Sequence, residues 1–272
     1  MAVAPGVAQA DSSSSSNWSG YVAHRGGVSF RRVSAGWTQP SVSCTPGLPT
    51  YSAVWVGLGG FSETSPALEQ IGTEVDCNAT GQTVSSAWYE LVPSPTKSIR
   101  LTVAPGDAMH ASVQVVGDGV TLALADDTRH TSFTKAVKAA TVDISSADWI
   151  LEAPSECISS YECRALPLAD FGSVHFSGAR AMTKSGRRGS VSSGLWGTTK
   201  ITLATVLGGR RYVDFAPIGG ATPMALIDGG SAFAVDYLQP AVNPVLFGRE
   251  SAASAAPAKG TVAPGGLRRP HP

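Results

Sequence analysis

The stretch ALEQIGTEVDCNATGQTVSSAWYEL, residues 67–91, contains two alternating segments joined by a polar loop. Successive side chains of a β-strand point to opposite faces of a sheet, so every second residue shares a face. Gln70 and Glu74 therefore share a face in the first segment, as Trp88 and Glu90 do in the second. Because the two segments are close in sequence, we expect a hairpin that carries these four side chains on one surface.

Many other short segments of the chain have the same character. They are rich in Val, Thr, Ser, Trp and Tyr, and turn signals such as Pro-Gly and Gly-Asp-Gly separate them. Almost none shows the 3.6-residue period of an amphipathic helix over three turns. Short strands at near-regular spacing predict an all-β fold, either an antiparallel sandwich or a barrel.

Composition divides the chain into three parts. Residues 1–16 form a leader with a serine-rich end, residues 17–239 hold the predicted strands, and residues 240–272 form an Ala/Pro/Gly-rich tail. We expect the leader and the tail to be disordered. Ala-Gln-Ala at 8–10 resembles the cleavage site of an export signal, although the basic start and full apolar core are missing. We favour a signal that begins further upstream over an accidental resemblance, and therefore expect a secreted protein.

The distribution of charged and of apolar residues argues against two classes of partner. Twenty basic residues balance twenty acidic ones. The basic pairs are scattered along the chain rather than clustered, which does not predict a nucleic-acid partner. No apolar run approaches the roughly 18 residues that a membrane span needs.

Four cysteines are consistent with an oxidising compartment. Three pairings are formally possible. We favour a bridge between Cys157 and Cys163, which enclose a short loop, and this leaves Cys44 and Cys77 to pair with each other. The alternative is four buried free thiols. The spacing fits no zinc motif, so we expect no metal and no cofactor.

The segment ADWILEA, residues 147–153, places the carboxylate of Glu152 directly after an apolar run. A charge in an apolar neighbourhood costs several kcal/mol unless it is paired, hydrated or used. Alternation turns Trp149 and Leu151 to the face opposite Glu152, so they can pack while the carboxylate faces a groove. We expect water and the amide of Gln70 to compensate the charge.

A carboxylate that faces a carboxamide can hydrolyse an amide bond. The carboxylate takes a proton from water and delivers it to the leaving amine, and the amide N–H stabilises the oxyanion. The simpler interpretation is a solvated sheet face. No GxSxG elbow, HExxH motif or phosphate-binding loop is present. A serine triad that uses His110 or His175 stays open as an alternative.

Several motifs occur in a specific order along the chain. They are NWSG at 17–20, AVWVGLGG at 53–60, LEQIGTE at 68–74, AWYEL at 87–91, PGD at 105–107, and DWILE at 148–152 followed by ECISSYEC. In this order and spacing the chain resembles the glutamic peptidases, or eqolisins, which are pepstatin-insensitive acid endopeptidases. The resemblance extends to about Tyr237. It implies a sandwich of two large antiparallel sheets with a substrate groove on one face.

The resemblance also implies roles for individual residues. Carried over by motif, the catalytic pair is Gln70 and Glu152. Glu152 would activate water and protonate the leaving nitrogen, while Gln70 would hold the water and stabilise the oxyanion. The residues expected to bind substrate are Trp18, Trp55, Gly60, Trp88 and Glu90. Ordinary packing is the competing interpretation for the tryptophans.

The chain also departs from the family pattern. Gly59, Ser86 and the pair at 154–155 replace acidic or aromatic residues of fungal relatives, which changes the expected specificity. A net charge of zero predicts a higher pH optimum than in the strongly acidic fungal enzymes, although still an acidic one. We expect a monomer that acts on polypeptides. The alternatives are a lectin-like sandwich that binds carbohydrate and a catalytically inactive relative used for adhesion.

Overall fold

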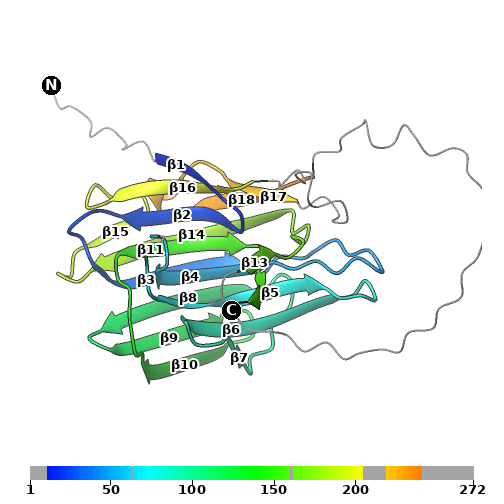
Figure 1. Ribbon diagram of the computed structural model, residues 1–272, viewed down its shortest axis with the longest axis horizontal. Coiled ribbons are helices and arrows are strands. Elements are labelled where there is room, and N and C mark those ends of the chain that lie inside the picture. The colour runs from blue at the N-terminus through cyan, green and yellow to red at the C-terminus, as the bar shows by residue number, and fades with distance from the viewer. Residues whose placement is uncertain (1–10, 63, 160–161, 205–218, 241–272) are drawn as a thin grey trace, which may run out of the picture.

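The computed structural model describes residues 11–62, 64–159, 162–204 and 219–240 (Figure 1). Of residues 157–159, 162 and 163 only the backbone is described. The predictions for residues 1–10 and for the tail from residue 241 onward lie outside the described residues.

The described residues form strands and one 3-10 turn, with no α-helix. The first nine strands are β1 (Asp11–Ser15), β2 (Trp18–His24), β3 (Phe30–Thr38), β4 (Ala53–Gly59), β5 (Leu68–Cys77), β6 (Thr83–Val92), β7 (Lys97–Ile99), β8 (Ala108–Val116) and β9 (Gly119–Asp126). The others are β10 (Thr131–Lys138), β11 (Ser146–Glu152), β12 (Ser155–Ser159), β13 (Glu162–Ala165), β14 (Ser173–Thr183), β15 (Arg188–Ser190), β16 (Gly197–Leu203), β17 (Gly220–Pro223) and β18 (Phe233–Leu238), with the turn η1 (Asp228–Gly230) before β18. The all-β prediction is confirmed.

Sixteen strands form one hydrogen-bonded sheet in the order β10-β9-β8-β3-β14-β18-β17-β16-β2-β11-β4-β5-β6-β7, with β1 beside β16 and β15 beside β14. The paired strands are antiparallel, except that β1 runs parallel to β16. β12 and β13 pair separately. The prediction of two separate large sheets is not confirmed, because backbone hydrogen bonds connect all sixteen strands.

The large sheet curls so that its two halves share one core. Trp37 of β3 belongs to the same buried cluster as Val54 of β4, although several strands separate β3 from β4 in the sheet. Near the two ends of the strand order, Tyr89 of β6 and Phe133 of β10 stack with ring centroids 5.9 Å apart. The sheet is therefore nearly closed. We call the face toward this core the inner face and the opposite one the outer face.

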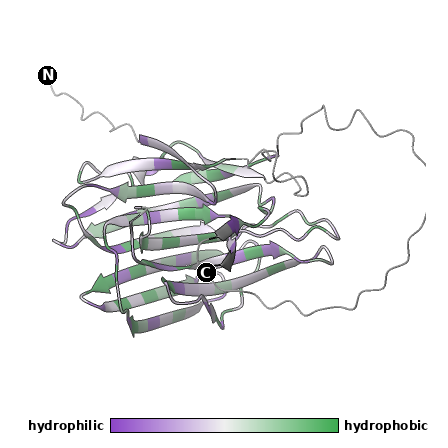
Figure 2. Ribbon diagram, in the orientation of Figure 1, coloured by the Kyte–Doolittle hydropathy of each residue, from purple (hydrophilic) through white to green (hydrophobic). Residues whose placement is uncertain are grey.

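Hydrophobic and hydrophilic residues alternate along many strands (Figure 2). In β4, Val54 and Val56 belong to the shared core, whereas Trp55 between them points outward. Trp55 joins a second, smaller buried cluster that includes Trp88 and Ile150. The outer face of this half of the sheet thus has an apolar floor of its own.

Strand register agrees with the faces predicted from alternation. β5 and β6 pair along their length as the predicted hairpin, with Gln70 opposite Glu90. β11 lies between β2 and β4, with Glu152 opposite both Trp18 and Ala53. Paired residues of antiparallel strands share a face. Two distant parts of the sequence therefore meet on one outer surface.

The described end of the leader differs from its prediction. Asp11–Ser15 was expected to be disordered, but it forms β1 and pairs with residues 199–203 of β16. The neighbouring strand β16 supplies the backbone partners that a polar serine run needs to adopt extended structure.

The favoured bridge between Cys44 and Cys77 is present. Register places Cys157 directly opposite Cys163 on β12 and β13. The side chains of these two residues lie outside the described part of the structure, so their bridge stays a prediction. No helix in the described ranges has the length and apolar character to cross a membrane.

Candidate active site

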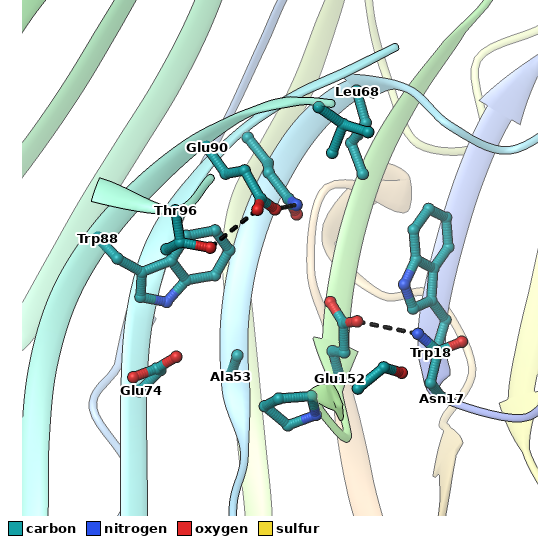
Figure 3. A pocket seen from close by; sticks show the side chains of 13 residues that line it. Asn17, Trp18, Ala53, Leu68, Glu74, Trp88, Glu90, Thr96 and Glu152 are labelled. Atoms are coloured by element: carbon teal, nitrogen blue, oxygen red, sulfur yellow. Dashed lines mark hydrogen bonds between the residues drawn. The ribbon is translucent and has the colours of Figure 1, made fainter. Parts of the chain in front are cut away.

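A groove of about 250 Å³ lies on the outer face over β4, β5, β6 and β11 (Figure 3). Its lining includes three glutamates, a glutamine and two tryptophans: Glu74, Glu90, Glu152, Gln70, Trp18 and Trp88. No lysine, arginine or aspartate lines the groove. Within the described ranges, His, Cys, Asp and Glu side chains form no group of three or more that could hold a metal ion.

Strand register sets the order of side chains across the groove. Gln70 and Glu90 form one cross-strand row, and in the next row Gly72 lies between Trp55 and Trp88. A Cβ atom at residue 72 would lie 2.6 Å from the Cβ atom of Trp55, which is closer than carbon atoms pack. Glycine at this position therefore lets the Trp55 side chain form the floor of the groove.

Glu152 is half-buried at the end of β11 and accepts two hydrogen bonds. Nδ2 of Asn17 donates to Oε1 at 2.9 Å (Figure 3), and Nε1 of Trp55 donates to Oε2 at 2.8 Å. Burial raises the pKa of Glu152 to about 7, against the effect of the Trp55 donor, and the charge of Glu90 raises the pKa further. The carboxyl group therefore exchanges its proton near neutral pH, where a general acid or base is most effective.

Gln70 is 5% exposed and is oriented by Glu90. Nε2 of Gln70 donates to Oε2 of Glu90 at 2.7 Å, and Oγ1 of Thr96 donates to Oε1 of Glu90 at 2.8 Å (Figure 3). Oε1 of Gln70 is buried and has no hydrogen-bond partner among the described residues. An amide nitrogen carries two N–H donors. Gln70 thus has a free acceptor and a second donor for a molecule in the groove.

The structure brings most of the predicted site residues together. Trp18, Trp88 and Glu90 line the groove with the proposed catalytic pair. Trp55 lies beneath it and contacts Glu152 directly. Gly60 is not among the lining residues, because it follows β4 beyond the groove and its N–H donates to Oγ of Ser65 at 3.0 Å. The histidines of the alternative serine triad, on β8 and β14, do not line the groove either.

Four hydrogen bonds in the site were not predicted from the sequence. Asn17 and Trp55, rather than Gln70, donate to Glu152, while Gln70 donates to Glu90. Thr96, which completes the hydrogen bonding of Glu90, was not predicted at all. Asn17 precedes Trp18, the residue that lies opposite Glu152. The contact between Asn17 and Glu152 therefore follows once the pairing of β2 with β11 is known.

Two further carboxyl groups lie buried in the same half of the sheet. Glu69, on the inner face of β5, is fully buried, and neither of its carboxyl oxygens has a hydrogen-bond partner among the described residues. Burial raises its pKa to about 8. Asp148 of β11 is also fully buried, and burial raises its pKa well above the ordinary value, assisted by the charges of Asp143 and Glu69.

Solved structures of glutamic peptidases resemble the chain. Scytalido-glutamic peptidase with a transition state analog inhibitor is 22% identical with a TM-score of 0.64, and the match covers 82% of this chain and 98% of that one. SCP-B, an eqolisin in complex with the tripeptide Ala-Ile-His, is 22% identical with a TM-score of 0.61 and the same coverage. Aspergilloglutamic peptidase from Aspergillus niger is 24% identical with a TM-score of 0.53, over 70% of this chain and 99% of that one. At these identities the likeness shows the fold.

The family assignment comes from the sequence itself. The model of the Peptidase A4 family matches residues 16–208, which include Gln70 and Glu152. No curated protein matches the chain. Because the family model covers more than half of the 272 residues, the chain belongs to the Peptidase A4 family and is a peptidase, as its resemblance to the eqolisins predicted.

Proposed function

We propose that the chain is a secreted, monomeric endopeptidase that hydrolyses polypeptides with Glu152 and Gln70. In the proposed reaction, ionised Glu152 takes a proton from water and the water oxygen attacks the carbonyl carbon of the scissile bond. An N–H of Gln70 donates to the carbonyl oxygen as negative charge develops there. The C–N bond then breaks, and Glu152 gives its proton to the leaving nitrogen.

One observation carries this proposal: the carboxyl and the amide line the same groove, and other side chains hold each of them. Asn17 and Trp55 fix the carboxyl group of Glu152, and Glu90 fixes the amide of Gln70. Groups that are already oriented need little reorganisation when charge develops in the transition state.

The pKa of Glu152 indicates where in the pH range the peptidase works. A general base must be ionised, and below a pKa of about 7 its ionised fraction falls tenfold per pH unit. We therefore propose an optimum in the weakly acidic to neutral range, above that of strongly acidic fungal relatives. The measurement is the pH profile of casein cleavage, and an optimum below about pH 3 would contradict this reasoning.

The groove also suggests how substrate is held. Oε1 of Gln70 and Nε1 of Trp88 are buried polar atoms without partners in the described structure. A peptide backbone offers a donor and an acceptor at nearly every residue, so an extended substrate could satisfy both. Because no aspartate lines the groove, we propose that pepstatin, an inhibitor of aspartic peptidases, does not inhibit the enzyme.

The Cys44–Cys77 bridge supports the proposal of secretion, because disulfides persist in oxidising compartments. The carbohydrate-binding alternative has weaker support. Trp55 is fully buried and Trp88 is 6% exposed, which leaves only the half-buried Trp18 as a ring on which a sugar could stack.

The Glu152→Gln variant tests the proposed mechanism. It keeps the shape of the side chain and removes the proton carrier, so kcat/KM on denatured casein should fall at least about 100-fold. The matched control is Glu74→Gln, which removes a carboxylate from the same groove but outside the proposed pair. Circular dichroism checks that both variants fold. Cleavage by folded Glu152→Gln at the parent rate would refute the mechanism.

A further inference from the structure

A second groove, of about 490 Å³, lies over β3, β8, β14 and β15, on the part of the sheet that carries no proposed active-site residue. Figure 1 labels these four strands. We call it the arginine groove. Its principal lining residues are Arg31, Arg32, Arg180, Arg188, Ser34 and Gln114. The proposed peptidase reaction uses none of these side chains.

Strand pairing gathers arginines that are far apart in sequence. Met182 of β14 lies between Arg32 of β3 and Arg188 of β15, so the three side chains share the outer face. Arg180 lies two residues before Met182 and therefore points the same way. The register of β3 against β14 shifts between Arg32 and Phe30, which leaves Arg31 as an extra residue. Such a bulge lets two consecutive side chains turn toward one surface.

The groove has no acidic counterpart on its own strands. β3, β8, β14 and β15 contain no aspartate or glutamate. None of the four arginines forms an ion pair within the described part of the chain. The turn after β14 adds Lys184 and Arg187, which are both exposed. Positive charge is therefore concentrated here, although the whole chain has a formal net charge of zero.

Neutral side chains hold part of this cluster in place. Arg32 donates to Oγ of Ser112 at 3.2 Å and to Oε1 of Gln114 at 3.4 Å, and Nε of Arg31 donates to Sδ of Met182 at 3.1 Å. Arg180 and Arg188 are exposed at the groove. Like charges this close repel one another, and a bound anion would relieve that repulsion.

We propose that the arginine groove binds phosphate groups, either as a single phosphate or as an oligophosphate. A guanidinium group presents a planar fork of donors that matches a phosphate bidentately. A phosphate group also carries more charge and more acceptor oxygens than a carboxylate, which suits several converging arginines. Strands lie about 4.8 Å apart and alternate residues about 6.7 Å apart, so the arginines can contact one phosphate or successive ones. No aromatic residue lines the groove, which disfavours stacking of nucleic-acid bases.

Isothermal titration calorimetry at constant ionic strength tests this site. The probes are inorganic phosphate and sodium tripolyphosphate, with sodium chloride as the ionic-strength control. We expect the parent protein to bind tripolyphosphate, and Arg32→Gln/Arg188→Gln to bind it at least about tenfold more weakly. Similar affinity for both probes identifies a single-phosphate site, whereas much tighter binding of tripolyphosphate identifies a site for repeated phosphates.

The matched control is Arg100→Gln/Lys135→Gln, which removes the same charge from two exposed positions outside the groove. Its affinity should stay within about twofold of the parent value, because screened surface charges contribute little. Equal weakening in both double variants, or no binding of either probe by the parent protein, would overturn the proposal. The Tm of each variant without ligand shows whether it is folded. The Glu152→Gln variant should bind tripolyphosphate like the parent protein, so this test does not depend on peptidase activity.

Discussion

The two grooves use the same outer face of one curled sheet in opposite ways. The proposed active-site groove is lined by three glutamates and no basic residue, and the arginine groove is lined by four arginines and no acidic residue. Side chains on the inner face pack in the shared core. Side chains on the outer face do not, so their charge can differ between the two halves of the sheet. A net charge of zero therefore conceals two surfaces of opposite sign.

The two regions also differ in how far their charges can change with pH. Burial moves the pKa of Glu152 to about 7, so its charge is variable in the physiological range. A guanidinium group stays charged at any pH that a protein tolerates. One surface is thus suited to proton transfer and the other to constant attraction of anions.

The largest expected effect concerns stability in the half of the sheet that carries buried acids. The folded-state pKa of Glu69 is about 8 against an ordinary 4.5, so the folded state binds more protons and stability falls as pH rises between these values. The upper limit is on the order of 5 kcal/mol at 1.36 kcal/mol per unit. Asp148 contributes in the same direction. Urea unfolding at pH 4, 6 and 8 measures the loss.

Glu69→Gln is the control for this stability loss, because a neutral amide does not titrate. The variant should unfold at nearly the parent urea concentration at pH 4 and should be more stable than the parent protein at pH 8. A parallel decline of both proteins with pH would show that Glu69 is not responsible.

The next largest effect is expected for Gln70→Ala. Removing one oxyanion donor typically lowers kcat by roughly 10²- to 10³-fold, while substrate binding elsewhere in the groove is retained. We therefore expect kcat on a peptide substrate to fall and KM to change little. An unchanged kcat would contradict the proposed role of Gln70 in stabilising the oxyanion.

A smaller effect is expected for Trp55→Phe, which removes the hydrogen bond to Oε2 of Glu152. This donor lowers the pKa of Glu152, so its loss should raise that pKa. The acidic limb of kcat/KM should move upward by about one pH unit. Trp88→Phe is the control, since Trp88 lines the groove without a hydrogen bond to Glu152. Equal shifts in both variants would contradict the role of Trp55.

The smallest effect on peptidase activity is expected for Arg180→Gln in the arginine groove. The residue is exposed and lies outside the active-site groove, so kcat/KM should stay within about twofold and stability within about 0.5 kcal/mol. Peptide cleavage measures kcat/KM, and urea unfolding measures the stability. A large loss of activity would show that the two grooves are coupled.

Sequence analysis succeeded where the pattern is local. Alternation alone assigns Gln70 and Glu90 to one face, and a hairpin between nearby strands needs little more than the loop between them. Assigning Gln70 and Glu152 to one groove needed the family resemblance, because β5 and β11 are far apart in sequence and β4 lies between them in the sheet.

The features that could not be predicted, the arginine groove and the contact between Asn17 and Glu152, depend on pairing between strands that are distant in sequence. Arg32 and Arg188 count as scattered basic residues until β3, β14 and β15 lie side by side. The contact between Asn17 and Glu152 likewise spans 135 positions. Periodicity reports which side of a strand a residue occupies, but not which distant strand comes next to it.

The pairing of β1 with β16 has a consequence for shortened versions of the chain. Oγ of Ser15 donates to Oδ1 of Asn17 at 3.2 Å and accepts from the N–H of Trp18 at 3.0 Å. Asn17 in turn presents its Nδ2 to Glu152. A truncation that begins at residue 17 would keep both proposed catalytic residues but lose the hydroxyl group that orients Asn17. We therefore expect a version that begins at Asp11, and so keeps β1, to be more active than one that begins at residue 17.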